Sequence, residues 1–116
     1  MYQLQYADIQ ADAVVDAKER ERELIQRSIG LLEVARDAPA NSMAKVEATH
    51  FTRRLWTAFL EDLSQPDNQL PKELRASLIS IGIWLLKEVE RIRTGDSEDY
   101  DGVIEISTTI MEGVGG

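Results

Sequence analysis

Apolar residues recur at helical spacing through residues 71–94, and this is the clearest pattern in the chain. One stripe follows intervals of three and four residues, which keep side chains on a single helix face. It consists of Leu74, Leu78, Ile81, Leu85, Val89 and Ile92. A second stripe of Ile79, Ile83 and Leu86 flanks it. Proline suits a first helical turn and glycine the position after the last, so Pro71 and Gly95 predict the two ends. We predict a helix over residues 71–94 that is buried from two sides, because apolar residues cover more than half of its circumference.

A long helix is also predicted over residues 16–38. Its apolar face is broad, because one stripe consists of Leu24, Ser28, Leu31 and Ala35, and Ile25, Ile29 and Leu32 lie beside it. Asp16, followed three residues later by an acidic residue, indicates an N-cap. Pro39 ends the helix because proline cannot continue the hydrogen-bond ladder.

A second long helix is predicted from residue 41 or 42 to residue 64. Its apolar face comprises Ala48, Phe51, Leu55, Phe59 and Leu63, widened by Trp56 and Leu60. Residues 65–68, Gln-Pro-Asp-Asn, then form a turn, since proline fixes φ and Asn and Asp bend the backbone locally. This turn connects the second helix to the helix over residues 71–94.

The two ends of the chain give weaker patterns. Residues 103–114 have helical apolar spacing, although their β-branched residues favour strand locally, and we predict a short helix after an acidic loop at 96–102. Residues 1–15 form either an extended arm packed on the bundle or the beginning of the first helix. The chain of 116 residues suits one domain, residues 1–116. The predicted fold is all-α, a small antiparallel bundle of three long helices plus a shorter C-terminal helix.

The charge distribution narrows the classes of partner. Thirteen Lys and Arg against 21 Asp and Glu give a net charge of −8, and no Lys or Arg follows Arg93. Such a surface repels phosphate, which disfavours direct nucleic-acid binding. No apolar run reaches the ~20 residues of a membrane helix, and no secretory signal is visible. We therefore expect a cytoplasmic protein without membrane contact.

Candidate catalytic and metal-binding groups do not combine into a site. The chain has no cysteine, and its one histidine, His50, has no partner in a recognised ligand pattern, so we assign it a structural or surface role. Residues 97–108 fail as a calcium loop because Ser97 and Thr108 stand where carboxylate ligands are needed. The adjacent Arg53 and Arg54 are interpreted as surface ion-pairing residues. We expect no enzyme, no cofactor and no metal.

The hairpin connecting the second and third helices carries a specific sequence. Its elements are Arg54-Leu55-Trp56-Thr57, Asp62-Leu63, Pro66, Asn68, Leu70-Pro71 and Leu74-Arg75-Ala76. This string resembles the FlaF family of flagellar biosynthesis regulatory proteins. Supporting features lie at the ends, in Met1-Tyr2-Gln3 and in Met111-Glu112-Gly113-Val114. Thr52 departs from the asparagine expected before Arg-Arg-Leu-Trp.

The resemblance implies a cytoplasmic protein that binds flagellin as a chaperone and promotes its synthesis and export, acting opposite a translational repressor. The third helix has more apolar surface than one neighbour covers, so either the C-terminal helix and the N-terminal segment cover the surplus or a partner does. We predict that a partner-binding groove for flagellin is bordered by Leu60, Ile79, Ile83, Trp84 and Leu86. Trp84 lies away from the main stripe and is a candidate exposed anchor.

Two alternatives remain open at the level of sequence. The protein could regulate synthesis through flagellin mRNA or the translational repressor, and RNA binding would weaken steeply with salt. It could also be a homo-oligomeric structural bundle that uses the same stripe on a second copy.

Overall fold

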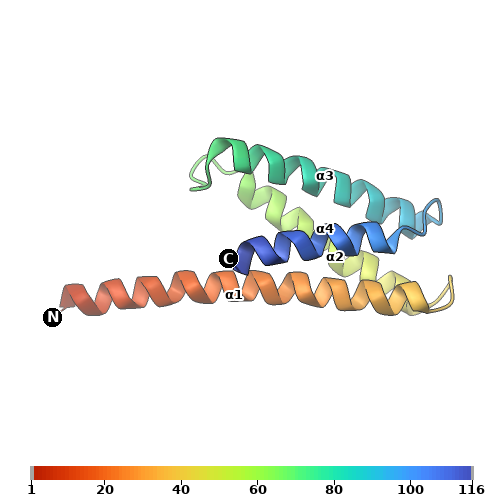
Figure 1. The fold of residues 1–116 in the computed structure, drawn as a ribbon, viewed down its shortest axis with the longest axis horizontal. Coiled ribbons are helices and arrows are strands. Elements are labelled where there is room, and N and C mark those ends of the chain that lie inside the picture. The colour runs from red at the N-terminus through yellow and green to blue at the C-terminus, as the bar shows by residue number, and fades with distance from the viewer. Residues whose placement is uncertain (1, 116) are drawn as a thin grey trace.

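Four helices form an antiparallel all-α bundle, as the sequence predicted (Figure 1). The computed structural model describes the backbone of residues 2–115 and the side chains of residues 17–113. The helices are α1 (Tyr2–Asp37), α2 (Met43–Leu63), α3 (Lys72–Thr94) and α4 (Tyr100–Gly115). Within the described residues there is no strand. The β-branched residues of the last segment therefore do not prevent a helix, because its apolar face is covered by the rest of the bundle.

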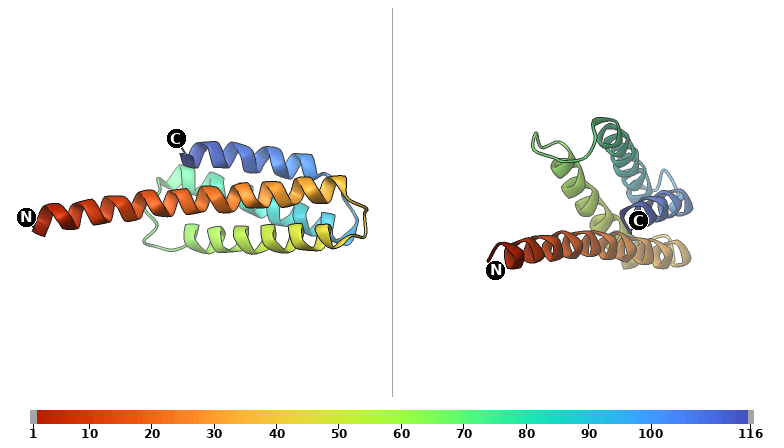
Figure 2. Two further views of the ribbon diagram at one scale, coloured as in Figure 1. Left: turned by 90° about the horizontal axis from the view of Figure 1, so that it is seen from below. Right: turned by 60° about the vertical axis from the view of Figure 1, so that its left-hand side comes forward.

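Helix α1 is much longer than predicted. Of the two alternatives for residues 1–15, the backbone follows the second, since α1 is helical from Tyr2 onward. Asp16 is therefore not an N-cap, which is physically reasonable because residues 2–16 contain neither proline nor glycine to interrupt the helix. The side chains of this segment lie outside the described part. The amino-terminal half of α1 projects past the other helices (Figure 2), giving overall dimensions of 58 × 26 × 20 Å.

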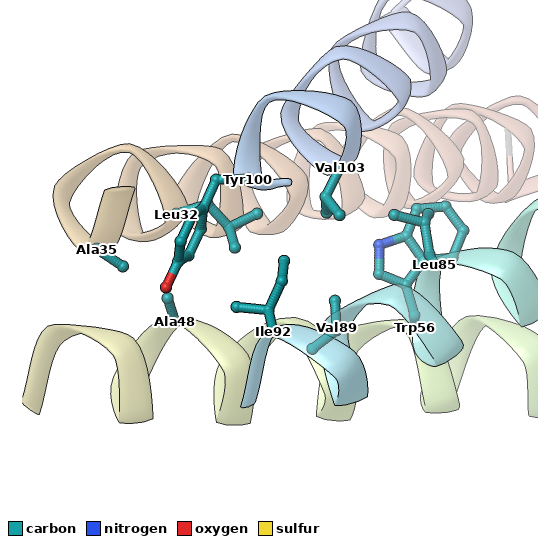
Figure 3. Close-up of a cluster of buried hydrophobic side chains, with 9 residues drawn as sticks. All are labelled: Leu32, Ala35, Ala48, Trp56, Leu85, Val89, Ile92, Tyr100 and Val103. Carbon is teal, nitrogen blue, oxygen red and sulfur yellow. The ribbon is translucent and has the colours of Figure 1, made fainter. Parts of the chain in front are cut away.

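All four helices contribute to one hydrophobic core (Figure 3). Its buried members are Leu32 and Ala35 of α1, Ala48 and Trp56 of α2, Leu85, Val89 and Ile92 of α3, and Tyr100 and Val103 of α4. A second cluster joins Ile25 and Ile29 of α1 to Leu55 of α2. Each helix thus buries part of the apolar face that its sequence period defines.

Burial of the main α3 stripe decreases toward the hairpin loop. Leu85, Val89 and Ile92 are at most 2% exposed, whereas Leu74 is 46% exposed. The amino-terminal half of α3 stands away from α4, which packs mainly along α1 (Figures 1 and 2). Leu70, in the loop that precedes α3, is also 39% exposed. The stripe marks the inward face of α3, but no neighbouring helix extends far enough to cover its first turns.

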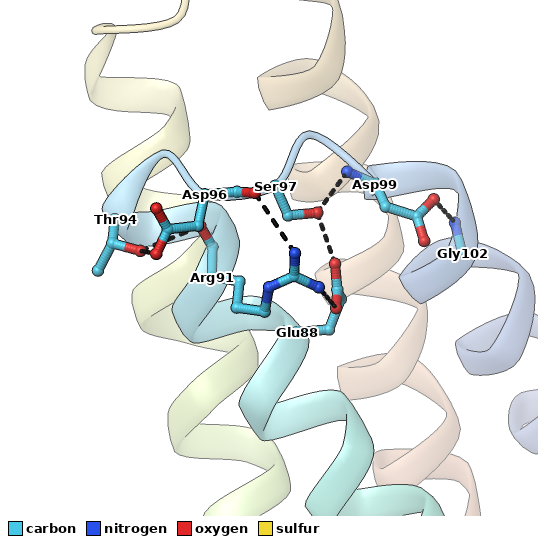
Figure 4. A network of polar contacts seen from close by, with 7 residues as sticks. All are labelled: Glu88, Arg91, Thr94, Asp96, Ser97, Asp99 and Gly102. Atoms are coloured by element: carbon cyan, nitrogen blue, oxygen red, sulfur yellow. Dashed lines mark hydrogen bonds and ion pairs between the residues drawn. The ribbon is translucent and has the colours of Figure 1, made fainter.

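The loop between α3 and α4 is fixed by polar contacts (Figure 4). Gly95 has φ +87°, and the N–H of the next residue donates to the carbonyl of Arg91 at 2.8 Å, which ends α3 in a Schellman motif. Glu88 is only 7% exposed, and it accepts hydrogen bonds from Arg91 at 3.1 Å and from the Ser97 hydroxyl at 2.5 Å. The Ser97 oxygen in turn accepts from the backbone N–H of Asp99 at 3.1 Å. The acidic loop is therefore a structural connection that sets where α4 begins.

Removing the N-cap of α4 is expected to destabilise the bundle. The Asp99 carboxylate accepts the backbone N–H of Gly102 at 3.0 Å. We expect Asp99→Ala to lower the free energy of unfolding by about 1 kcal/mol, and Asp99→Asn to lower it less because the amide oxygen still caps. Urea unfolding followed by circular dichroism measures both. Asp67→Ala removes the same charge from the α2–α3 loop, and a loss at Asp99 no larger than this control would show that the cap contributes nothing.

Candidate functional site

Helices α2 and α3 approach each other closely at Gly82. A Cβ atom placed on Gly82 would lie 2.8 Å from Cδ2 of Leu60 and 3.4 Å from Cε3 of Trp56. Glycine therefore allows the Leu60 side chain to lie directly against the α3 backbone. Ile79 and Leu86 are three and four residues from Gly82, so they are its neighbours on the helix surface. Leu60 is thereby brought beside both of them.

Four of the five predicted partner-binding residues share one surface. Ile79, Ile83 and Leu86 are spaced by four and three residues and lie on one face of α3, with Leu60 of α2 beside them. We call these four residues the apolar strip. Ile83 is 44% exposed, the other three are half-buried, and Leu86 also packs against the core. The apolar strip lies on the outer side of the α2–α3 hairpin.

Trp84 does not lie on the apolar strip. It follows Ile83 directly, and consecutive residues are turned by about 100° around a helix. Its side chain is 39% exposed on a different flank of α3. The sequence identified Trp84 correctly as an exposed aromatic residue, but the structure does not bring it to the other four.

A groove with basic walls continues the apolar strip away from the hairpin loop. Its volume is about 340 Å³. Helix α2 contributes Lys45, Val46, Thr49, His50 and Arg53. Helix α3 contributes Val89, Glu90 and Arg93. We call these eight residues the basic groove. Glu90 lies four residues after Leu86, on the same face of α3, so the basic groove and the apolar strip are continuous along that helix.

The charges of the basic groove are unusual in so acidic a protein. Lys45, Arg53 and Arg93 oppose one carboxylate, that of Glu90. Arg93 Nε donates to Glu90 Oε2 at 2.8 Å, and a second guanidinium nitrogen contacts the other oxygen. The hydrogen bond from Arg93 lowers the pKa of Glu90, and the charges of Arg93 and Arg53 lower it further. Glu90 is therefore ionised and already engaged, which leaves the cations in excess.

Sequence reasoning missed the basic groove. It interpreted Arg53 and Arg54 as surface ion-pairing residues, but neither has an acidic partner within 4 Å in the part of the chain whose side chains are described. His50 is exposed, which agrees with the surface role that was one of the two expected for it. It also lines the basic groove. The spacing of His50, Arg53 and Leu60, which places all three on one side of α2, is the signal that could have connected them.

Other kinds of site find no support in the described residues. Across the side chains of residues 17–113, no three His, Asp or Glu residues are grouped as metal ligands. No helix that the structure describes combines the length and hydropathy needed to cross a membrane.

Comparison with known proteins identifies the family of the chain. The family model described as "Flagellar protein FlaF" matches residues 2–114. No curated protein and no solved structure matches the chain. The match spans nearly the whole bundle, including the hairpin that carries the apolar strip and the basic groove. The protein belongs to the FlaF family of flagellar proteins.

Proposed function

We propose that this FlaF protein binds flagellin as a cytoplasmic chaperone and promotes its synthesis and export. The observation that carries the proposal is the apolar strip, a continuous surface along α3 that borders the four-helix core at Leu86 and includes the exposed Ile83. Ile83, at 44% exposed, has no covering helix in the described chain. An apolar surface of this kind is typical of a site that receives a partner.

The shape of the apolar strip suits an amphipathic helix. Peptide helices bind such surfaces by inserting residues spaced three and four apart, the same spacing that the strip itself presents. An unassembled flagellin terminus with an apolar face would be protected from aggregation while it lies there. The net charge of −8 would keep the complex soluble.

Ile83→Asp is expected to weaken flagellin binding at least about tenfold. A carboxylate placed in an apolar contact must be desolvated without a partner, which costs more than the ~1.4 kcal/mol that a factor of ten represents. A pull-down with purified flagellin, quantified by titration, measures the loss. Val34→Asp is the matched control, because Val34 is 61% exposed and lies on α1, which contributes no residue to the apolar strip. Circular dichroism verifies that both variants fold.

The outcomes separate the members of the predicted site. Unchanged flagellin binding by folded Ile83→Asp would refute the apolar strip as the binding surface. Trp84→Ala decides the remaining residue, because a loss there would extend the site around α3 onto a second flank. The position of Trp84 off the strip leads us to expect an effect smaller than that of Ile83→Asp.

The alternative functions predict different solution behaviour. A homo-oligomeric bundle would cover the apolar strip with a second copy, so light scattering after size exclusion would give a multimer without flagellin and no change of composition with it. A regulator acting on the translational repressor would form a complex with that protein instead. Both are tested in the same experiment by adding each component in turn.

A further inference from the structure

The outer surface of the α2–α3 hairpin has two ends of different chemistry. The apolar strip lies toward the hairpin loop, and the basic groove lies toward the opposite end of the helices. On α3 both lie on one face, from Ile79 to Arg93. These 14 intervals, at about 1.5 Å each, span about 21 Å, which matches a partner helix of about 14 residues.

We infer that the basic groove binds carboxylates on the same partner segment whose apolar face lies on the apolar strip, so that the partner is an amphipathic helix with acidic residues at one end. The inference rests on the proposed function and deepens it, since it specifies the chemistry and the direction of the bound segment. Apolar contact supplies affinity, and the charges fix which way the segment lies.

The walls of the basic groove, and not its floor, provide the recognition. The floor includes Val89 and Thr49, each 2% exposed. The Thr49 hydroxyl donates to the carbonyl of Lys45 at 2.8 Å, so it is already satisfied within α2. Lys45 and Arg53 have no carboxylate within 4 Å among the described side chains. Two cations on the α2 wall are thus available to a ligand.

The surroundings of the basic groove favour a short acidic peptide over a nucleic acid. Glu47, Glu61 and Asp62 are exposed on the same helix, α2. A polyphosphate chain longer than the groove would run into this negative surface, where repulsion acts over a Debye length of about 8 Å. Two or three carboxylates at one end of a helix fit within the groove and avoid those residues.

The test uses synthetic peptides of 14 residues with one leucine-rich face. In the first pair, one peptide carries a block of three glutamates in its last two turns and the other carries three glutamines there. In the second pair, the block of glutamates or glutamines lies in the first two turns. Binding is measured by fluorescence anisotropy with the full chain. With the block at one of the two ends, we expect the glutamate peptide to bind about fivefold more tightly than the glutamine peptide. A few partly exposed ion pairs allow a preference of this size.

Substitution of the two available cations, Lys45 and Arg53, should abolish this preference. In Lys45→Gln/Arg53→Gln the glutamate and glutamine peptides are expected to bind equally, within about twofold. Arg22→Gln/Arg54→Gln removes the same charge from exposed positions outside the groove and should keep the fivefold preference. Circular dichroism confirms that each variant is helical.

Several results would overturn the inference. Equal binding of glutamate and glutamine peptides in both orders would do so, while binding that still depends on Ile83 would leave the proposed function standing. A preference that survives in Lys45→Gln/Arg53→Gln would place the acidic contact elsewhere. A labelled 20-nucleotide single-stranded RNA that binds more tightly than the glutamate peptides, and loses affinity in the groove variant, would assign the groove to RNA instead.

Discussion

Trp56→Ala is expected to lower the free energy of unfolding by about 3–5 kcal/mol, the usual cost of emptying a large aromatic site in a core. Trp56 is 1% exposed and belongs to the cluster in which all four helices meet. Its ring meets Phe59 edge to face, with centroids 5.4 Å apart and planes at 88°. Because small domains are stable by only about 5–15 kcal/mol, the loss would leave much of the variant unfolded under mild denaturation.

Two further tryptophan variants test the reason for this loss. The Trp56 indole N–H is buried without a hydrogen-bond partner in the described structure, so Trp56→Phe removes an unsatisfied donor while keeping an aromatic ring, and it should cost much less than alanine. Trp84→Ala makes the same deletion at a side chain that is 39% exposed. Urea unfolding followed by circular dichroism compares all three. A cost for Trp56→Ala equal to that for Trp84→Ala would contradict the central place of Trp56 in the core.

Gly82→Val is expected to destabilise the bundle by about 1–3 kcal/mol through overpacking of the α2–α3 contact. Its Cβ would lie 2.8 Å from Cδ2 and 3.1 Å from Cγ of Leu60, and its two methyl groups would extend further toward Leu60 and Trp56. Gly82→Ala should cost less, because the Leu60 tip can shift. Gly30→Ala, in an open helical position of α1 with nothing within 4 Å of the added carbon, should instead stabilise by about 0.5–1 kcal/mol.

A double-mutant cycle assigns the cost of Gly82→Val to a specific contact. Leu60→Ala removes the atoms that the valine would meet, so the double variant should lose less stability than the sum of the two single losses. Chemical denaturation of the four proteins provides the cycle. Strict additivity would show that the strain arises against the backbone or Trp56 and not against Leu60.

Much of the fold followed from sequence because helix signals are local. Helix α1 ends just before Pro39, which cannot continue a helix, and α3 ends at Gly95, which takes the left-handed conformation. The apolar stripe of α3 predicted which face of that helix is buried. The exposure of Leu74 could not be predicted in this way. Periodicity defines a direction on one helix, whereas burial depends on how far the neighbouring helices reach, and α4 has only 16 residues.

The candidate site was predicted in part for the same reason. The apolar strip follows from spacing within α3, although the place of Leu60 on it depends on the close approach at Gly82. The basic groove combines Arg53 and Arg93, which are 40 residues apart and meet only when α2 and α3 take their observed register. The sequence of α2 shows the pair Arg53-Arg54 and His50, but sequence spacing within one helix does not predict that Arg93 of α3 lies opposite them.

The helices of the bundle pack as two pairs, α1 with α4 and α2 with α3, joined mainly through α1 and α2. Helix α4 packs mainly on α1, α3 packs mainly on α2, and α3 and α4 touch only slightly. The apolar strip and the basic groove are both built from α2 and α3 alone. A ligand on this outer surface would therefore contact only one of the two helix pairs and leave the α1–α4 pair uncovered.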